Sequence, residues 1–316
     1  MERATGGFGT GSWNRPPHLT TREPRPHACD TIADMRRREA IAVLAGSVCA
    51  QGADFLPGGQ GAAVLVDVRT RRLLWAANRS AAARSLAAPG STMKPFVLAA
   101  LLRSGKLDSG AAFLCPAKLR IGGRVLDCSH PPVSSPMRVD TALAYSCNCF
   151  VAHFAEKFSA GEIAREFEGA GLAARTGWWG EDEAAGKIRA ASGPDAIRLQ
   201  ALGEDGIVIS VAELASAYRT LALKASAPDM RPVLAGLEGA VEYGTAQNAR
   251  VAGVKVAGKT GTSIGSAGEP VAWFAGFLPS AAPEVAIAVT VPGRSGGADA
   301  APVAGQILEA HRAGRL

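Results

Sequence analysis

Residues 88–96 read Ala-Pro-Gly-Ser-Thr-Met-Lys-Pro-Phe, and the apolar run Val-Leu-Ala-Ala-Leu-Leu follows directly. The segment from Ser91 to Leu102 predicts a helix that is apolar almost all round, and such a helix packs in the centre of a protein. Ser91 would begin this helix directly after a Pro-Gly pair, with Lys94 on the same face one turn later. The stretch therefore predicts a buried central helix that starts with a serine and a lysine.

Strand-like segments lie on both sides of this helix in the sequence. The predicted strands are residues 62–68, 73–78, 251–263, 272–278 and 285–291. The predicted helices are residues 91–102, 137–175, 208–223 and 300–311. Helices that interrupt the strands of one antiparallel sheet indicate an α+β fold, in which the sheet is flanked by helices and an all-helical lobe is inserted into it.

The composition of the 316 residues is that of a globular protein, with 47% hydrophobic and 20% charged residues. Aromatic residues make up only 6%, which disfavours a stacking platform for single-stranded nucleic acid. The net charge is +6, but its Lys and Arg residues are scattered rather than arranged along one helix. We therefore expect no nucleic-acid partner.

The N-terminal region carries a targeting pattern rather than a folded domain. Residues 1–34 are rich in Gly, Pro, Thr and Arg, which indicates disorder or a misassigned start. Residues 35–53 start with Met35, three arginines and then about eleven apolar residues, the pattern of a signal peptide. A buried N-terminal helix is the alternative. We expect export to the periplasm or another extracytoplasmic space, and a catalytic domain over residues 60–314.

Four of the six cysteines follow this region, at Cys115, Cys128, Cys147 and Cys149. Export would permit disulfides. Cys115 and Cys128 flank a predicted hairpin over residues 119–126, so the two alternatives are a Cys115–Cys128 bridge and two unpaired buried thiols. The only close pair is Cys147-x-Cys149, and zinc ligands are usually spaced by two or more residues. The sequence therefore predicts no metal site and no cofactor.

Several familiar catalytic signatures are missing. None of His130, His153 and His311 lies near a Gly-x-Ser-x-Gly elbow, and no Walker or Rossmann glycine pattern follows a strand. A serine nucleophile in this chain would need a base other than histidine. A desolvated Lys94 could take the proton of Ser91, and the start of the helix offers free N–H groups to an oxyanion. The alternative is a capping serine beside a surface lysine.

Two further motifs follow in the chain. Lys259-Thr260-Gly261-Thr262 lies in an apolar predicted strand, where a lysine with glycines and threonines fits the edge of a cleft. Ser146-Cys147-Asn148 lies in the helical block, and its hydroxyl and amide can face a cleft from a short loop. The three motifs occur in the order Ser-x-x-Lys, Ser-x-Asn, Lys-Thr-Gly.

This order resembles the signature of the penicillin-recognising serine enzymes. The surrounding sequence is similar to class B penicillin-binding protein transpeptidase domains over about residues 62–308. The similar stretches are residues 88–96, 142–148, 244–246, 257–262, 273–277 and 300–304. The resemblance implies a β-lactamase/transpeptidase-like fold, peptidoglycan stem peptides as substrates and β-lactams as covalent inhibitors.

The resemblance also implies roles for individual residues. The implied catalytic residues are Ser91, Lys94, Ser146 and Lys259, and the implied substrate-binding residues are Asn148, Thr260, Gly261 and Thr262. Ser91 would be acylated by a D-Ala-D-Ala peptide with Lys94 as base. Ser146 would relay the proton to the leaving nitrogen, and the N–H groups of Ser91 and Thr262 would form the oxyanion hole.

The sequence leaves alternatives to a D,D-transpeptidase or carboxypeptidase. Only about ten residues separate the predicted signal peptide from the first strand, so we expect a free-standing catalytic domain of β-lactamase size. A serine β-lactamase is one alternative, but no Glu-x-x-Leu-Asn follows Ser146, and Asn148 differs from the aliphatic residue of class D enzymes. A non-catalytic β-lactam sensor or cell-wall binding module is the other.

Overall fold

The computed structural model describes residues 55–265 and 267–316. The predicted disordered start over residues 1–34 and the predicted signal peptide over residues 35–53 lie outside these residues. Among the helices of the described ranges, none is long and apolar enough to cross a membrane.

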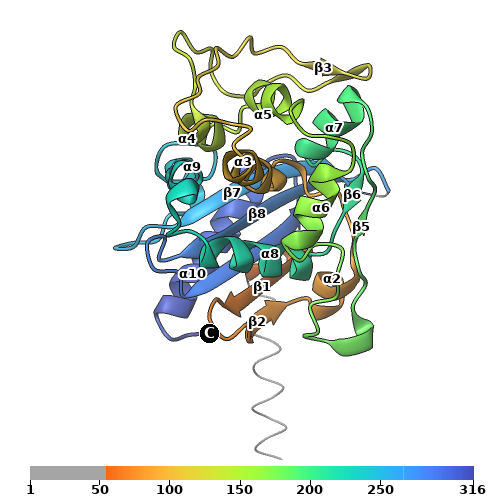
Figure 1. The fold of residues 1–316 in the computed structure, drawn as a ribbon. Coiled ribbons are helices and arrows are strands. Elements are labelled where there is room, and N and C mark those ends of the chain that lie inside the picture. Colours follow the sequence, from red (N-terminus) through yellow and green to blue (C-terminus); the bar gives the residue numbers. More distant parts are fainter. Residues whose placement is uncertain (1–54, 266) are drawn as a thin grey trace, which may run out of the picture. The chain divides into compact units, whose positions relative to one another are not determined.

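A five-stranded antiparallel sheet forms the centre of the described residues (Figure 1). Its strands are β1 (Ala62–Asp67), β2 (Leu73–Ala77), β7 (Ala257–Ile264), β8 (Pro270–Leu278) and β9 (Val285–Pro292). They lie in the order β2-β1-β9-β8-β7, so β1 joins the N-terminal hairpin to the C-terminal strands by pairing with β9. The prediction of one antiparallel sheet built from both ends of the chain is confirmed, and β7 is an edge strand.

The segment between β2 and β7 forms the inserted lobe. Its helices are α2 (Arg79–Arg84), α3 (Lys94–Arg103), α4 (Val139–Ala144), α5 (Asn148–Ala155), α6 (Glu162–Gly169), α7 (Pro194–Ala201), α8 (Val211–Leu223) and α9 (Arg231–Glu242). Two short strand pairs also belong to it, β3 (Arg120–Ile121) with β4 (Arg124–Val125) and β5 (Lys187–Ile188) with β6 (Ile207–Val208). The lobe is therefore mainly helical rather than all-helical. Figure 1 shows α4, α5 and β3 gathered at the end farthest from β1 and β2.

Both faces of the sheet are covered, which explains why strands such as β1 are apolar at consecutive positions. Val64 and Val66 of β1 pack into the core shared with the lobe, whereas Ala63 and Leu65 pack into a second core on the opposite face. The helix α10 (Ala301–Arg312) contributes to that second core. In α3, every residue from Lys94 to Leu101 is buried, so the predicted central helix is confirmed.

Three predicted boundaries differ from the structure. The α-helix starts at Lys94, because Gly90–Met93 form a 3₁₀ turn, η3, in which the Thr92 hydroxyl donates to the Pro89 carbonyl at 2.8 Å. The block at 137–175 divides into α4, α5 and α6, with Ser146 at φ 58° between the first two. Residues 251–256 lie outside the strand β7, and the apolar side chains of Val251 and Val256 are buried in the second core instead.

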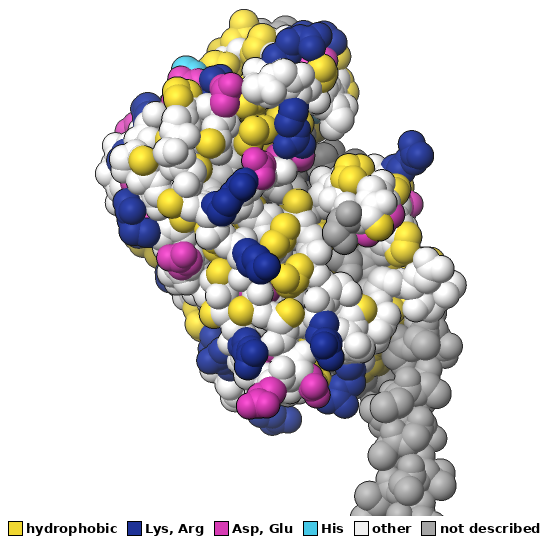
Figure 2. All heavy atoms as spheres, turned by 90° about the vertical axis from the view of Figure 1, so that its right-hand side faces the viewer, with side chains coloured by type: hydrophobic (Ala, Val, Ile, Leu, Met, Phe, Trp, Pro, Cys, Tyr) yellow, Lys and Arg dark blue, Asp and Glu magenta, His cyan; other side chains and the backbone are white. Residues whose placement is uncertain are grey.

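On the face in Figure 2, Lys and Arg side chains are spread out and mixed with Asp and Glu. Several form ion pairs, such as Lys106 with Glu162 and Arg189 with Asp205. This face carries no continuous basic stripe of the kind that follows a phosphate backbone.

Candidate active site

The turn η3 presents Ser91 at the N-terminal end of the central helix. The backbone N–H of Lys94 donates to the Ser91 carbonyl and continues the turn into α3. Ser91 is half-buried and lines a cleft of about 500 Å³. The local sequence thus places a serine hydroxyl at the floor of a cleft, one turn before a lysine on the same helix.

Lys94 is fully buried and its amine reaches the Ser-x-Asn motif. Its Nζ donates to the Ser146 carbonyl oxygen at 2.7 Å, to Ser146 Oγ at 3.2 Å and to Asn148 Oδ1 at 2.5 Å. The left-handed backbone of Ser146 turns both of its oxygen atoms towards this lysine. The two motifs, 52 residues apart in the chain, therefore form one hydrogen-bonded group.

Burial changes the acid–base properties of both motif lysines. Desolvation lowers the pKa of Lys94 from its ordinary value to about 8. Desolvation, and to a smaller extent the positive charge of Lys94, hold the pKa of Lys259 well below its ordinary value. The Lys259 amine donates to the Thr260 carbonyl oxygen at 3.0 Å. A lysine with a pKa near 8 is available as a neutral base close to neutral pH.

The Lys-Thr-Gly motif lies on β7 and packs directly against the turn η3, which carries Ser91. A Cβ atom at Gly261 would lie 2.6 Å from the Pro89 carbonyl oxygen, and one at Gly90 would lie 2.5 Å from the Thr262 carbonyl oxygen. Only glycine fits at these two positions, and Gly90 also has a φ of 55°. The strand and the turn therefore meet through their backbones, which brings Thr262 beside Ser91 in the cleft.

The cleft brings together all of the residues that the sequence singled out. Six of them line it, namely Ser91, Ser146, Asn148, Thr260, Gly261 and Thr262. Lys94 and Lys259 are buried and adjoin them, Lys94 through its bonds to Ser146 and Asn148, and Lys259 next to Thr260 in β7. The roles assigned to these residues remain predictions, but their proximity is a feature of the structure.

Further cleft residues carried no assigned role from the sequence. They are Ser129, Glu204, Thr245, Arg294, Ser295, Gly296 and Gly297. The Thr260 hydroxyl donates a hydrogen bond to Thr245 Oγ1 at 2.9 Å, and the stretch Gly244-Thr245-Ala246 marked Thr245 in the sequence. No local pattern marks Glu204 or Arg294, which arrive from a loop after α7 and from the turn after β9.

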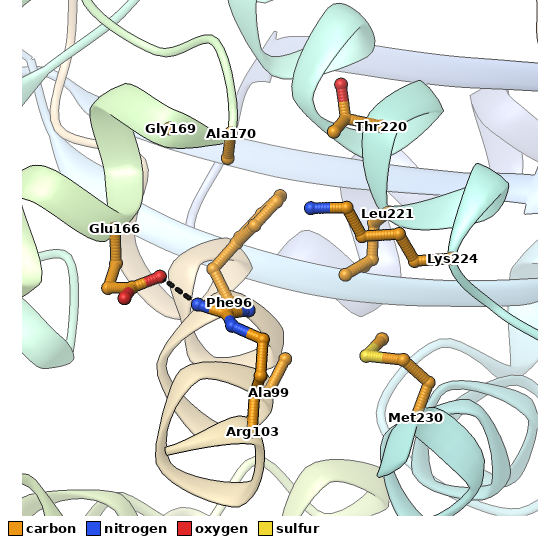
Figure 3. Close-up of a pocket in the computed structure, with 10 residues that line it drawn as sticks. All are labelled: Phe96, Ala99, Arg103, Glu166, Gly169, Ala170, Thr220, Leu221, Lys224 and Met230. Atoms are coloured by element: carbon orange, nitrogen blue, oxygen red, sulfur yellow. Dashed lines mark hydrogen bonds and ion pairs between the residues drawn. The ribbon is translucent and has the colours of Figure 1, made fainter. Parts of the chain in front are cut away.

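A second cavity, of about 300 Å³, lies between α3, α6 and α8 (Figure 3). Its lining includes Phe96 and the ion pair of Arg103 with Glu166, which Figure 3 shows bridging α3 and α6. It shares no residue with the cleft that holds Ser91. It is therefore separate from the candidate active site.

The four described cysteines are all free thiols, so the predicted Cys115–Cys128 bridge is wrong and the alternative of unpaired thiols holds. The Sγ atoms of Cys115 and Cys128 lie 3.6 Å apart, whereas a disulfide bond is about 2.05 Å long. Cys128 Sγ is also 3.7 Å from Cys147 Sγ and 3.5 Å from Cys149 Sγ. Cys128 therefore lies close to three other sulfur atoms and is bonded to none of them.

Known proteins share both the sequence pattern and the fold. The family model for the penicillin-binding protein transpeptidase domain matches residues 61–309. A peptidoglycan glycosyltransferase from Burkholderia ambifaria superposes with a TM-score of 0.72 at 23% identity, over 87% of this chain and 96% of that one.

Two more solved structures give the same result. The transpeptidase domain of penicillin-binding protein 3 from Burkholderia pseudomallei matches with a TM-score of 0.72 at 23% identity, over 87% of this chain and 94% of that one. PBP2 from Pseudomonas aeruginosa matches with a TM-score of 0.72 at 19% identity, over 84% and 76%. The predicted fold class is thereby confirmed. With the family model covering most of its length, the chain belongs to the penicillin-binding protein transpeptidase family, enzymes that act on peptidoglycan outside the cytoplasm.

Proposed function

We propose that this chain is a serine D,D-transpeptidase or carboxypeptidase that is acylated at Ser91 by D-Ala-D-Ala stem peptides. The observation that carries the proposal is the environment of Lys94, which is buried, follows Ser91 by one helical turn and is bonded to both polar residues of Ser146-Cys147-Asn148. The residues that line the cleft include no histidine, which leaves lysine as the base.

The proton can move along this hydrogen-bonded group. Lys94 donates three hydrogen bonds to Ser146 and Asn148 in the structure, so loss of one proton from its amine releases one of them. The lone pair that this frees can accept the proton of Ser91 Oγ, one helical turn away, as that oxygen attacks the carbonyl carbon. When the carbon–nitrogen bond of the terminal D-Ala breaks, the leaving nitrogen must gain a proton. Ser146 Oγ, 3.2 Å from Lys94 Nζ, can pass the proton from the lysine to that nitrogen.

The edge position of β7 suits binding of an extended peptide. An edge strand leaves alternate N–H and C=O groups without a partner strand, and a stem peptide can pair with them as an added strand. The N–H groups of Ser91 and Thr262 would then stabilise the oxyanion. The hydroxyls of Thr260 and Thr262, together with the guanidinium of Arg294, would bind the terminal carboxylate.

One observation supports a hydrolytic second candidate. Glu204 lines the cleft, so a carboxylate is present where a water could attack the acyl-enzyme. Its Oε2 accepts an ion-pair hydrogen bond from Arg124 at 2.7 Å, which fixes the position of the carboxylate in the cleft. If Glu204 activates water, carboxypeptidase or β-lactamase turnover replaces transfer to a second peptide.

Labelling with a fluorescent penicillin tests the proposal. We expect a covalent adduct on Ser91, located by peptide mass mapping, that is absent in Ser91→Ala while the circular dichroism spectrum is unchanged. A label that persists for hours supports the penicillin-binding enzyme, and rapid loss supports a β-lactamase. If the folded wild-type chain takes up no label, the acyl-enzyme proposal is wrong and a non-catalytic binding module remains.

We also propose that the chain is exported by the segment at residues 35–53. The support is the sequence pattern together with family membership, since peptidoglycan lies outside the cytoplasm. A fusion of residues 1–60 to a reporter enzyme that is active only outside the cytoplasm should be active. Replacing Arg36, Arg37 and Arg38 by Ala should reduce that activity, and an inactive wild-type fusion would contradict export.

A further inference from the structure

A cluster of metal-ligand side chains lies beside the Ser-x-Asn motif. One ligand atom from each of Cys115, Cys128, His130 and Cys147 lies within 4.8 Å of every other. Cys128 Sγ is 3.6 Å from Cys115 Sγ and 3.7 Å from Cys147 Sγ, and Cys115 Sγ is 3.6 Å from His130 Nε2. Cys115, His130 and Cys147 are buried and Cys128 is half-buried.

The three short separations are close to the edge lengths of a zinc tetrahedron. With Zn–S bonds of about 2.3 Å and Zn–N bonds of about 2.0 Å, two ligand sulfurs lie about 3.8 Å apart and a sulfur and a nitrogen about 3.5 Å apart. Thiolates and imidazole are also the ligands that select zinc over magnesium or calcium. We propose that Cys115, Cys128, His130 and Cys147 form a closed, four-coordinate Zn²⁺ site.

The surroundings of the four ligands fit this assignment. The distance of 2.8 Å between His130 Nδ1 and the Pro131 carbonyl oxygen requires Nδ1 to carry the hydrogen, which leaves the lone pair of Nε2 facing the cluster. Metal-bound histidines are held in this way by a backbone carbonyl. Backbone N–H groups of Ala117 and Phe150 point at Cys115 Sγ and Cys147 Sγ at 3.3 and 3.4 Å, as suits thiolates.

Cys149 stands apart from this set. Its Sγ lies 3.5 Å from Cys128 Sγ but is not within reach of all the other ligands. Its thiol instead donates to the Lys118 carbonyl oxygen at 3.6 Å, which a metal-bound thiolate cannot do. Cys149 is therefore a matched control, because it has the same side chain and lies in the same cluster without belonging to the four ligands.

This proposal differs from the expectation, drawn from the sequence, of no metal site. That expectation assumed ligands close together in the chain, whereas these come from the two sides of the β3–β4 hairpin and from the start of α5. When the ion binds, the three thiols release their protons to solvent, and the site carries a net charge of −1. Zinc would also keep the thiols from pairing as disulfides.

The ion would join the β3–β4 hairpin to the turn that carries Ser146 and Asn148. This inference rests on the proposed function. The Nδ2 of Asn148 donates to the Leu126 carbonyl oxygen at 2.9 Å, and Leu126 lies two residues before Cys128. Cys147 stands between Ser146 and Asn148 and caps α5 through its contact with the N–H of Phe150. The zinc ligands are therefore positioning residues, which hold Ser146 and Asn148 against Lys94.

Metal content tests the site independently of catalysis. When the chain is purified without chelators, inductively coupled plasma mass spectrometry should find one zinc ion per chain. Cys128→Ser should lose it, whereas Cys149→Ser and Ser91→Ala should keep it. A wild-type chain without zinc, a disulfide between any two ligand cysteines in its peptide map, or loss of zinc from Cys149→Ser but not from Cys128→Ser would overturn the proposal.

Cobalt substitution covers the case in which Cys128→Ser fails to fold. The wild-type chain loaded with Co²⁺ should show thiolate-to-cobalt charge-transfer bands and the intense visible bands of tetrahedral cobalt. Weak, octahedral-type bands without charge transfer would contradict a Cys₃His site. Chelation should lower the melting temperature, and Zn²⁺ but not Mg²⁺ should restore it.

The link to catalysis is measured on the same samples. Zinc removal should slow labelling by fluorescent penicillin about 10- to 100-fold, with recovery when Zn²⁺ is added back. An unchanged labelling rate would refute the positioning role while leaving the metal site in place. A zinc-containing chain that is never labelled would refute the proposed function instead, so the two failures are distinguishable.

Discussion

The amine of Lys94 donates to both oxygen atoms of Ser146, to the carbonyl at 2.7 Å and to the hydroxyl at 3.2 Å. The hydroxyl bond provides a path for the proton, and the carbonyl bond fixes the backbone that carries the hydroxyl. The two hydrogen bonds depend on each other, because rotation of the Ser146 peptide would break the hydrogen bond to the carbonyl oxygen and move Oγ away from Lys94. The proposed proton path therefore depends on one turn of left-handed backbone, with Ser146 at φ 58°.

Replacement of Lys94 by Met should remove the base while nearly preserving the volume of a buried side chain. General-base catalysis is worth about 10²- to 10⁴-fold, so the second-order rate constant for acylation by fluorescent penicillin should fall within this range. Because no charge is buried in the variant, its melting temperature should stay level or rise. Lys187→Met, at an exposed position, is the control. A rate within threefold of wild type would exclude Lys94 as the base.

The pH dependence of acylation should follow the neutral form of Lys94. Since burial lowers the pKa of this lysine to about 8, the rate constant should rise with pH below about 8 and level off above it. The negative charge of Glu204 acts in the opposite direction and raises the pKa of Lys94. Glu204→Gln should therefore shift the midpoint of the profile to lower pH.

Stopped-flow measurement of acylation between pH 6 and 10 would determine both midpoints, a range set around the Lys94 value of about 8. Glu168→Gln removes an exposed carboxylate outside the cleft and should leave the midpoint in place. A midpoint that moves up in Glu204→Gln, or that stays fixed, would contradict the electrostatic argument.

Gly261→Ala should disturb both stability and labelling. The added methyl group would lie 2.6 Å from the Pro89 carbonyl oxygen and 2.9 Å from Thr92 Cγ2, so the strand and the turn η3 must move apart. Forced overpacking costs about 1–3 kcal/mol, which lowers the melting temperature by several degrees in a domain of this size. Gly169→Ala meets no atom within 4 Å and should change neither quantity. Equal melting temperatures for the two variants would show that the close contact between Gly261 and Pro89 does not contribute to stability.

Thr245→Val should weaken substrate binding through Thr260. The hydroxyls of these residues lie 2.9 Å apart, and the substitution leaves Thr260 Oγ1 without the partner that orients it. The loss of one such bond, about 0.5–1.5 kcal/mol, should raise the KM for a D-Ala-D-Ala peptide about 2- to 10-fold with little change in kcat.

Thr220→Val removes a hydroxyl that bonds to the Ser216 carbonyl within α8, far from the motif strand in the sequence, and serves as the control. If Thr245→Val lowered kcat and left KM unchanged, Thr245 would act in the chemical step rather than through the orientation of Thr260.

The motif residues could be found from the sequence because each motif is short and local. Ser91 and Lys94 are one turn apart, and Lys259 to Thr262 follow one another along a strand, so spacing alone indicates which side chains share a face. The first hairpin and the central helix were also predictable, since their apolar pattern and burial coincide.

Other features depend on contacts between distant segments. Apolar residues at 251–256 looked like part of a strand, but Gly253 has a φ of 73° and Val251 and Val256 are buried from a non-strand backbone. The cysteines gave a misleading pattern for the same reason, because the fold brings the sulfur atoms of Cys115 and Cys147 within 4.8 Å of each other although 31 residues lie between them in the sequence. Glu204 and Arg294 had no local signal at all.

The backbone contact between the turn η3 and β7 also bears on resistance to β-lactams, if Ser91 is acylated by them as proposed. Any side chain at Gly90 or Gly261 would collide with main-chain oxygen atoms, so a change there that excludes the drug would also displace Ser91. The exposed residues Ser129 and Arg294 at the mouth of the cleft have no such restriction. Selection by an antibiotic therefore has room to act at the entrance to the site, and very little at its floor.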